Sequence, residues 1–344
     1  MKMKIKPYSS IIYSVALVAC VAYAAFAQTG GYGQEQDKSK PTVSEEEGKA
    51  AKAVESAPDL AAKLTAAGEF LKKYPKSTIR KQIADYLVGE IGAVQDATQR
   101  IAHSENFQKL FTADTERDAI QPLIIHAYIQ AKKPDEAFTQ AAALLAKQPE
   151  NVNILTHLTI AGTEEAKRQN PKYVTQSQQY GLKAVELIEA NKKPADVDEA
   201  AWASQKQMLP RLYQNLGILS LVGGKSSEAK TKLEKSVSLD PSDPFNYVLL
   251  GSIVNEEYQQ LAQSYKSMPE GKPKEEALKK ATELLDKVID LYARALGTAH
   301  GKPEYDQLQT QILQDITPYY KYRHNGSTEG MQQLIDKYKT PAKP

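Results

Sequence analysis

The chain has 344 residues and a net charge of +2, with 25% charged and 8% aromatic residues. Three lysines and no acidic residue lie in its first 27 residues, and removing those three charges from +2 leaves a net charge of about −1 for the remainder. A nucleic-acid-binding domain needs a basic patch, so this balance excludes nucleic acid as a partner. Ala, Leu, Lys, Glu and Gln recur throughout and alternating β-branched runs are nearly absent, which predicts an all-α fold.

The first 27 residues are typical of an export signal. Three lysines precede an apolar stretch over residues 11–26, and Ala25 and Ala27 frame a small-residue cleavage site before Gln28. The apolar stretch is short for a membrane-spanning helix, which needs about 20 residues. We therefore expect cleavage after Ala27 and an exported, periplasmic protein.

A second interpretation of the same segment comes from its one cysteine. Leu17-Val18-Ala19-Cys20 resembles the lipobox of bacterial lipoproteins, in which the cysteine is acylated. Residues 21–27 stay apolar, whereas a lipoprotein usually turns polar directly after its cysteine. Lipidation at Cys20 and an uncleaved membrane anchor stay open as alternatives. A chain cleaved after residue 27 has no cysteine, so its core alone must hold it together.

The segment after the signal changes from a leader to helices. Residues 28–43 are rich in Gly, Gln and Lys without an apolar period, which indicates a flexible leader. Ser44 with Glu47 predicts a capped helix start, and Pro58 predicts the start of a second helix. Residues 78–111 predict another helix pair with poorer spacing.

Clearer helix pairs follow along the chain. Between residues 125 and 149, apolar and small residues recur at regular spacing, and Pro134 predicts the start of the second helix. Residues 152–168 and 172–190 predict the next pair, separated at Pro171. Residues 195–222 predict one unusually long helix, interrupted at Pro210.

The strongest pattern lies in residues 212–241. Two amphipathic segments turn back through a Gly-Gly pair, and both carry a small residue where their backbones must approach closely. The spacing of the tetratricopeptide pattern is met by Tyr213, Leu216, Gly217, Ala229, Leu233 and Pro241. The start of the pattern returns 34 residues later at Tyr247, Leu250 and Gly251.

This stretch therefore resembles a tetratricopeptide repeat. The resemblance implies an all-α, right-handed solenoid of about six or seven helix pairs over residues 44–338, several of them degenerate. The unit after Pro241 carries an insertion, with its first helix running to about residue 265 and its second starting near residue 274. Residues 339–344 are expected to be a disordered tail. Such repeats imply a non-enzymatic scaffold that binds a protein or peptide partner in its concave groove.

In the family that it resembles, the first helix of each pair lines the groove. Carried over onto the two clear units, the lining is Arg211, Gln214, Ile218, Val222, Phe245, Val248, Ser252 and Asn255. Family members that clamp a C-terminal carboxylate use Lys and Asn, and this lining lacks that cationic grip, so a chaperone-tail receptor is not expected. A lipid-anchored envelope-assembly component, an enzyme with an unrecognised site and a structural module are the rival hypotheses.

A scan for chemical motifs predicts no catalytic site, cofactor or metal. Gly224-Lys225-Ser226 resembles the end of a phosphate-binding loop, but Leu219 stands where that motif needs a glycine, so a turn between helices is predicted. The five histidines are scattered and have no cysteine partners for zinc. Ten of the 19 tyrosines lie from Tyr213 onward, where they either fill packing positions or form a contact surface.

Overall fold

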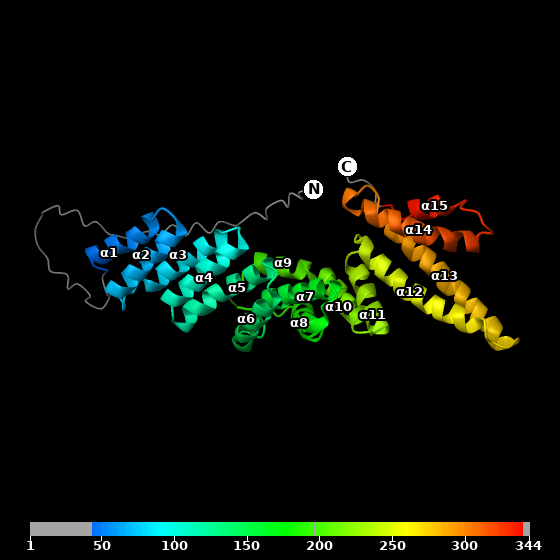
Figure 1. The fold of residues 1–344 in the computed structure, drawn as a ribbon, viewed down its shortest axis with the longest axis horizontal. Coiled ribbons are helices and arrows are strands. Elements are labelled where there is room, and N and C mark those ends of the chain that lie inside the picture. The colour runs from blue at the N-terminus through cyan, green and yellow to red at the C-terminus, as the bar shows by residue number, and fades with distance from the viewer. Residues whose placement is uncertain (1–42, 196, 340–344) are drawn as a thin grey trace, which may run out of the picture. The chain divides into compact units, whose positions relative to one another are not determined.

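The computed structural model describes residues 43–195 and 197–339 (Figure 1). The predicted export signal, Cys20, nearly all of the predicted leader and most of the predicted tail lie outside these residues. Within them the chain forms fifteen α-helices, two short 3₁₀ turns and no strand, so the all-α prediction is confirmed. The contacts divide the chain after Lys132 into two compact units. The predicted boundaries of a single repeat domain stay a prediction.

The first unit contains five helices, each packed on its neighbours in the chain. Their bounds are α1 Glu45–Ser56, α2 Leu60–Lys73, α3 Arg80–Ala93, α4 Ala97–Leu110 and α5 Asp114–Gln130. Ser44 caps α1 by accepting a hydrogen bond from the backbone N–H of Glu47 at 3.2 Å. Asp59 caps α2 in the same way, so α2 begins after Asp59 rather than at Pro58.

The second unit contains the remaining ten helices. Their bounds are α6 Pro134–Lys147, α7 Val152–Lys167, α8 Val174–Glu189, α9 Glu199–Gln207, α10 Leu209–Val222, α11 Ser226–Leu239, α12 Pro244–Tyr265, α13 Lys272–Ala299, α14 Asp306–Arg323 and α15 Met331–Asp336. The 3₁₀ turns are Pro171–Tyr173 and Pro303–Tyr305. The pairs α7–α8, α10–α11 and α12–α13 each pack closely, as the predicted helix pairs require.

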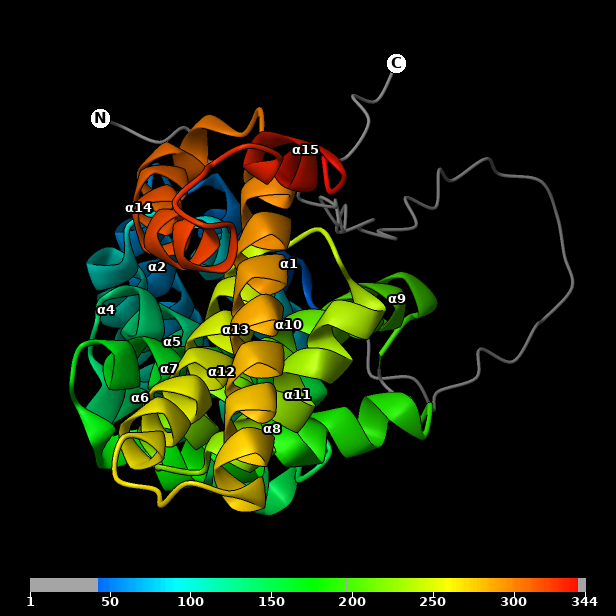
Figure 2. The same cartoon turned by 90° about the vertical axis from the view of Figure 1, so that its right-hand side faces the viewer.

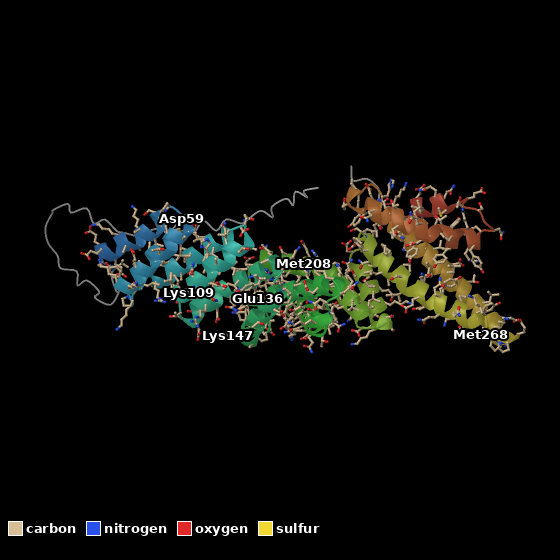
Figure 3. The ribbon with its side chains drawn as sticks, in the orientation of Figure 1. Asp59, Lys109, Glu136, Lys147, Met208 and Met268 are labelled. Carbon is tan, nitrogen blue, oxygen red and sulfur yellow. The ribbon has the colours of Figure 1, made fainter. Side chains whose placement is uncertain are left out.

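The predicted long helix over residues 195–222 is wrong. The chain turns at Met208 and forms two helices, α9 and α10 (Figure 3). Pro210 lies in the first turn of α10, where its missing N–H costs nothing. In a continuous helix that proline would remove a backbone hydrogen bond and its ring would clash with the preceding turn.

The insertion in the unit after Pro241 is built by lengthening both helices. The α12 and α13 helices have 22 and 28 residues and meet at a turn that contains Met268 (Figure 3). The α14 and α15 helices pack on α13 near its C-terminal end (Figure 2). The α15 helix is short and has only six residues.

Glycines set the distance between paired helices in the second unit. A Cβ atom added to Gly217 would lie 2.7 Å from Cγ of Leu233 and 3.4 Å from the carbonyl oxygen of Ala229. One added to Gly251 on α12 would lie 2.7 Å from Cδ1 of Tyr292 on α13. A carbon atom needs about 3.5–4.0 Å, so a side chain at either position would push the helices apart.

Replacing a glycine by alanine should lower the free energy of unfolding where the helices are in close contact and raise it where the glycine has open space. We expect Gly251→Ala to lower the free energy of unfolding of the second unit by about 1–3 kcal/mol, because its methyl group overlaps the Tyr292 ring. Fluorescence of Trp202, the one tryptophan, measures this unit during urea unfolding, since that side chain is 2% exposed in α9.

The matched control is Gly89 in α3, where an added Cβ has nothing within 4 Å. Gly89→Ala should raise the stability of the first unit by about 0.5–1 kcal/mol, because alanine is the better helix former. Hydrogen exchange of the α3 amides measures that change. Equal effects at both positions would show that glycine at the α12–α13 crossing is not required.

Candidate partner-binding surface

The four predicted lining residues of α10 differ in how far they are available to a partner. Arg211 is exposed, Ile218 is half-buried and Val222 is 45% exposed. Gln214 is used within the fold: its Nε2 donates to Oδ2 of Asp243 at 2.6 Å and to Oδ1 of Asn246 at 3.2 Å. Asp243 caps α12, so this amide holds α10 against the start of the next first helix.

The four predicted lining residues of α12 also divide into free and occupied side chains. Phe245 is 46% exposed and Ser252 is exposed, although the Ser252 hydroxyl donates to the carbonyl oxygen of Leu249 at 2.8 Å. Val248 packs against the core of the second unit. Asn255 accepts a hydrogen bond from the Tyr319 hydroxyl at 2.9 Å. The structure therefore leaves Phe245 as the large apolar side chain of α12 that a partner can reach.

An aromatic contact positions Phe245. Its ring meets that of Tyr305 in the 3₁₀ turn edge-on, with 5.6 Å between centroids and 72° between planes. Burial raises the pKa of the Tyr305 hydroxyl, and the carboxylate of Asp243 raises it further. The phenol is therefore neutral at physiological pH. Sequence reasoning missed Tyr305, because it lies 60 residues from Phe245 in a turn without consensus spacing.

An electrostatic interaction between His157 and Arg211 links α7 to α10. Burial lowers the pKa of His157 on α7, and the nearby guanidinium of Arg211 lowers it further. The His157 ring nitrogen Nδ1 also lies 2.8 Å from the Asn153 carbonyl oxygen. His157 therefore titrates below its ordinary range, and Arg211 stays the one charged member of the predicted lining.

Most of the C-terminal tyrosines fill packing positions. The hydroxyls of Tyr213, Tyr247 and Tyr320 donate to Glu189, to the Pro241 carbonyl and to the Glu329 carbonyl, at 2.8, 3.1 and 3.0 Å. Burial raises the pKa of Tyr213 and of Tyr292 to about 12 in each case.

Residues 319–324 form an aromatic and basic run, and most of its side chains have partners within the fold. Tyr320 stacks on His324, and Arg323 makes a bidentate ion pair with Asp286 at 2.6 and 3.0 Å. Tyr322 is 72% exposed. The run therefore offers one aromatic side chain to a partner rather than a basic patch.

The motifs associated with catalysis or cofactors have structural roles where the structure describes them. Gly224, with φ of +71°, ends α10, and the Lys225 N–H donates to the Ser220 carbonyl oxygen at 2.9 Å, so this segment is a turn between helices. Among residues 43–195 and 197–339, no group of three or more His, Cys, Asp or Glu side chains could hold a metal ion. Nor is any helix of that part long and apolar enough to cross a membrane.

No family model matches the chain, and no curated protein matches it. Among solved structures the chain is similar to PilF of Pseudomonas aeruginosa, with 14% identity and a TM-score of 0.35 over 85% of this chain and 100% of that one. It is also similar to a tetratricopeptide repeat protein from Parabacteroides merdae ATCC 43184, with 14% identity and a TM-score of 0.37 over 78% of this chain and 98% of that one. The structure itself shows an all-α array of packed helix pairs, with close helix crossings at Gly217 and Gly251.

Proposed function

We propose that the protein is a non-enzymatic scaffold that binds a segment of a partner protein on the face formed by the first helices α10 and α12. The observation that carries this proposal is the exposure of Val222 and Phe245, at 45% and 46%. Every other apolar side chain of residues 209–222 and 244–265 is buried or half-buried. Aromatic side chains that a partner can bury supply much of the binding energy in protein interfaces.

The surroundings of Phe245 also favour this use. The Tyr305 ring limits the motion of Phe245 before a partner arrives, so less side-chain entropy is lost on binding. Arg211 is the one charge among the eight predicted lining residues, so steering by charge is small. Affinity for the partner should therefore change little between low and physiological salt.

Site-specific photo-crosslinking in envelope extracts tests the proposal. A photoreactive phenylalanine analogue replaces Phe245 in one variant and Leu239 in a control variant. Leu239 is 40% exposed but lies at the end of the second helix α11. We expect one dominant crosslinked partner from position 245 and none from position 239. The same adducts from both positions would contradict a binding face on the first helices.

We further propose that the scaffold is exported to the bacterial cell envelope. The support is the lysine-rich start, the apolar stretch and the small-residue site before Gln28 in the sequence. Mass spectrometry of the exported protein should find Gln28, or its cyclised form, as the first residue. Recovery of an acylated Cys20 would instead indicate the lipid-anchored alternative, tethered to the membrane by its leader.

A further inference from the structure

The second unit contains a cavity that shares no residue with the predicted lining. Its volume is about 240 Å³, and its walls come from α11, α12 and α13. Tyr247, Leu250 and Val254 of α12 form an apolar floor, and Val237 and Leu291 add to it from the two second helices. The cavity therefore belongs to a different surface from that of Val222 and Phe245.

The walls of this cavity are held in place by contacts of their own. The Tyr247 hydroxyl donates to the Pro241 carbonyl oxygen, and Nε of Arg294 pairs with Oδ2 of Asp290 at 2.8 Å. The Arg294 guanidinium also lies 4.6 Å from the ring centroid of Tyr338. A cavity fixed in this way exists before any partner binds, so binding costs little reorganisation.

Two opposite charges at the rim remain unpaired. Glu234 on α11 and Lys287 on α13 line the cavity, and neither forms an ion pair with another residue that the structure describes. The other rim charges are neutralised within the fold, since Lys230 pairs with Glu257 at 3.0 Å and Arg294 pairs with Asp290. The rim therefore offers one negative and one positive group on facing helices.

The size of the cavity indicates what kind of group enters it. Sites for small molecules and cofactors usually measure about 300–1,000 Å³ and enclose most of the ligand. This cavity is smaller, at about 240 Å³. Its size and apolar floor instead suit one large side chain, as in the central pockets of protein interfaces that take an aromatic anchor.

We propose that this cavity is a second docking site, which takes a partner segment with one aromatic side chain flanked by an acidic and a basic residue. The aromatic side chain enters the cavity over Tyr247 and Leu250. The acidic residue pairs with Lys287, and the basic residue pairs with Glu234. The scaffold then binds two segments at once, one on the first-helix face and one between the second helices.

Three labelled heptapeptides with a central tryptophan test the rim charges by fluorescence anisotropy. One carries an acidic and a basic flank, one carries two acidic flanks and one carries two basic flanks. The purified protein should bind the mixed peptide about two- to fivefold more tightly than either other peptide. Glu234→Lys should shift the preference to the acidic peptide, and Lys287→Glu should shift it to the basic peptide. Lys232→Glu is the control, because Lys232 of α11 lies over the Tyr213 ring of α10 and does not line the cavity.

Two further measurements test the anchor. Val237→Trp fills the cavity and should weaken all three peptides at least about tenfold, with circular dichroism to verify the helix content. Replacing the peptide tryptophan by alanine should cause a similar loss and does not depend on any protein variant. Equal binding of the tryptophan and alanine peptides, a preference unaltered by both charge variants, or no binding of the mixed peptide at millimolar concentration overturns the proposal.

Two further outcomes would assign the cavity to a different occupant. Concentration-dependent dimerisation that Val237→Trp removes would assign the cavity to a second copy of the chain. Peptide binding that appears only after the chain is shortened to end at Lys339 would assign it to residues 340–344. Either result overturns the proposal of a partner segment.

Discussion

Replacing Val222 and Phe245 together by aspartate is expected to abolish partner capture while the helix content stays unchanged. Each change places a charge where the proposed interface buries an apolar group, and hot-spot positions of this kind cost about 2 kcal/mol or more each. Together they should weaken binding more than about hundredfold. Both side chains are nearly half exposed, so the free protein tolerates the charges. The measurements are the dissociation constant for the crosslinked partner and the far-ultraviolet circular dichroism spectrum.

The choice of these two positions depends on the structure. Ile218 and Val248 belong to the same predicted lining, but Ile218 is half-buried and Val248 packs against the core, so aspartate there would also destabilise the fold. Leu239→Asp is the matched control, with a similarly exposed apolar side chain on the second helix α11. If the Val222 and Phe245 double variant binds as tightly as the wild type, the first-helix face is not the binding surface.

Local spacing was sufficient to predict the pairs α7–α8, α10–α11 and α12–α13. The Gly217 and Ala229 pattern marks a close crossing because a helix places its contact residues at fixed intervals of three and four. The same reasoning missed Gly162 and Gly181, although an added Cβ would lie 2.7 Å from Cβ of Ser177 and 2.8 Å from Cγ2 of Thr159, respectively. These glycines occupy crossings in the α7–α8 pair, where the surrounding residues do not repeat the spacing of residues 212–241.

The candidate sites were less predictable, because they depend on contacts between successive pairs. The Asn255 and Tyr319 side chains lie 64 residues apart and meet only because α14 packs on α13, which pairs with α12. The cavity between α11 and α13 depends in turn on where the long α12–α13 pair places its second helix. No local motif encodes the distance between α11 and α13. The sequence could therefore predict a first-helix lining, but not which of the lining side chains stay free of contacts within the fold.

A buried ion pair in the first unit carries the second large expected effect. Nε and Nη2 of Arg80 on α3 donate to the Glu116 carboxylate on α5 at 2.6 and 2.9 Å, and the Glu116 side chain is 7% exposed. The same carboxylate accepts a hydrogen bond from the Ala113 N–H at 3.1 Å and so caps α5. Glu116→Ala should lower the free energy of unfolding of this unit by about 3 kcal/mol, because it leaves Arg80 without its partner and α5 without its cap.

The same pair predicts how the stability of the first unit depends on pH. Its hydrogen bonds with Arg80 lower the pKa of Glu116 below the ordinary value of 4.5. A carboxyl group with a lowered pKa stabilises the folded state above its unfolded pKa, and this contribution is lost as the pH falls through the folded value. The stability difference between the wild type and Glu116→Gln should therefore be constant from pH 7 to about 5 and shrink below about pH 4.5.

Hydrogen exchange of the α3 and α5 amides at several pH values measures this difference within the first unit alone. Asp85→Asn on α3 is the control, because the ion pair that Asp85 forms with Lys81 is exposed and should contribute less than about 0.5 kcal/mol. Glu116→Gln keeps the size of the side chain, so a loss much larger than that of Asp85→Asn must come from the charge. Parallel acid destabilisation of the wild type and Glu116→Gln would mean that the Arg80 pair does not join α3 to α5 energetically, and that apolar contacts hold them together.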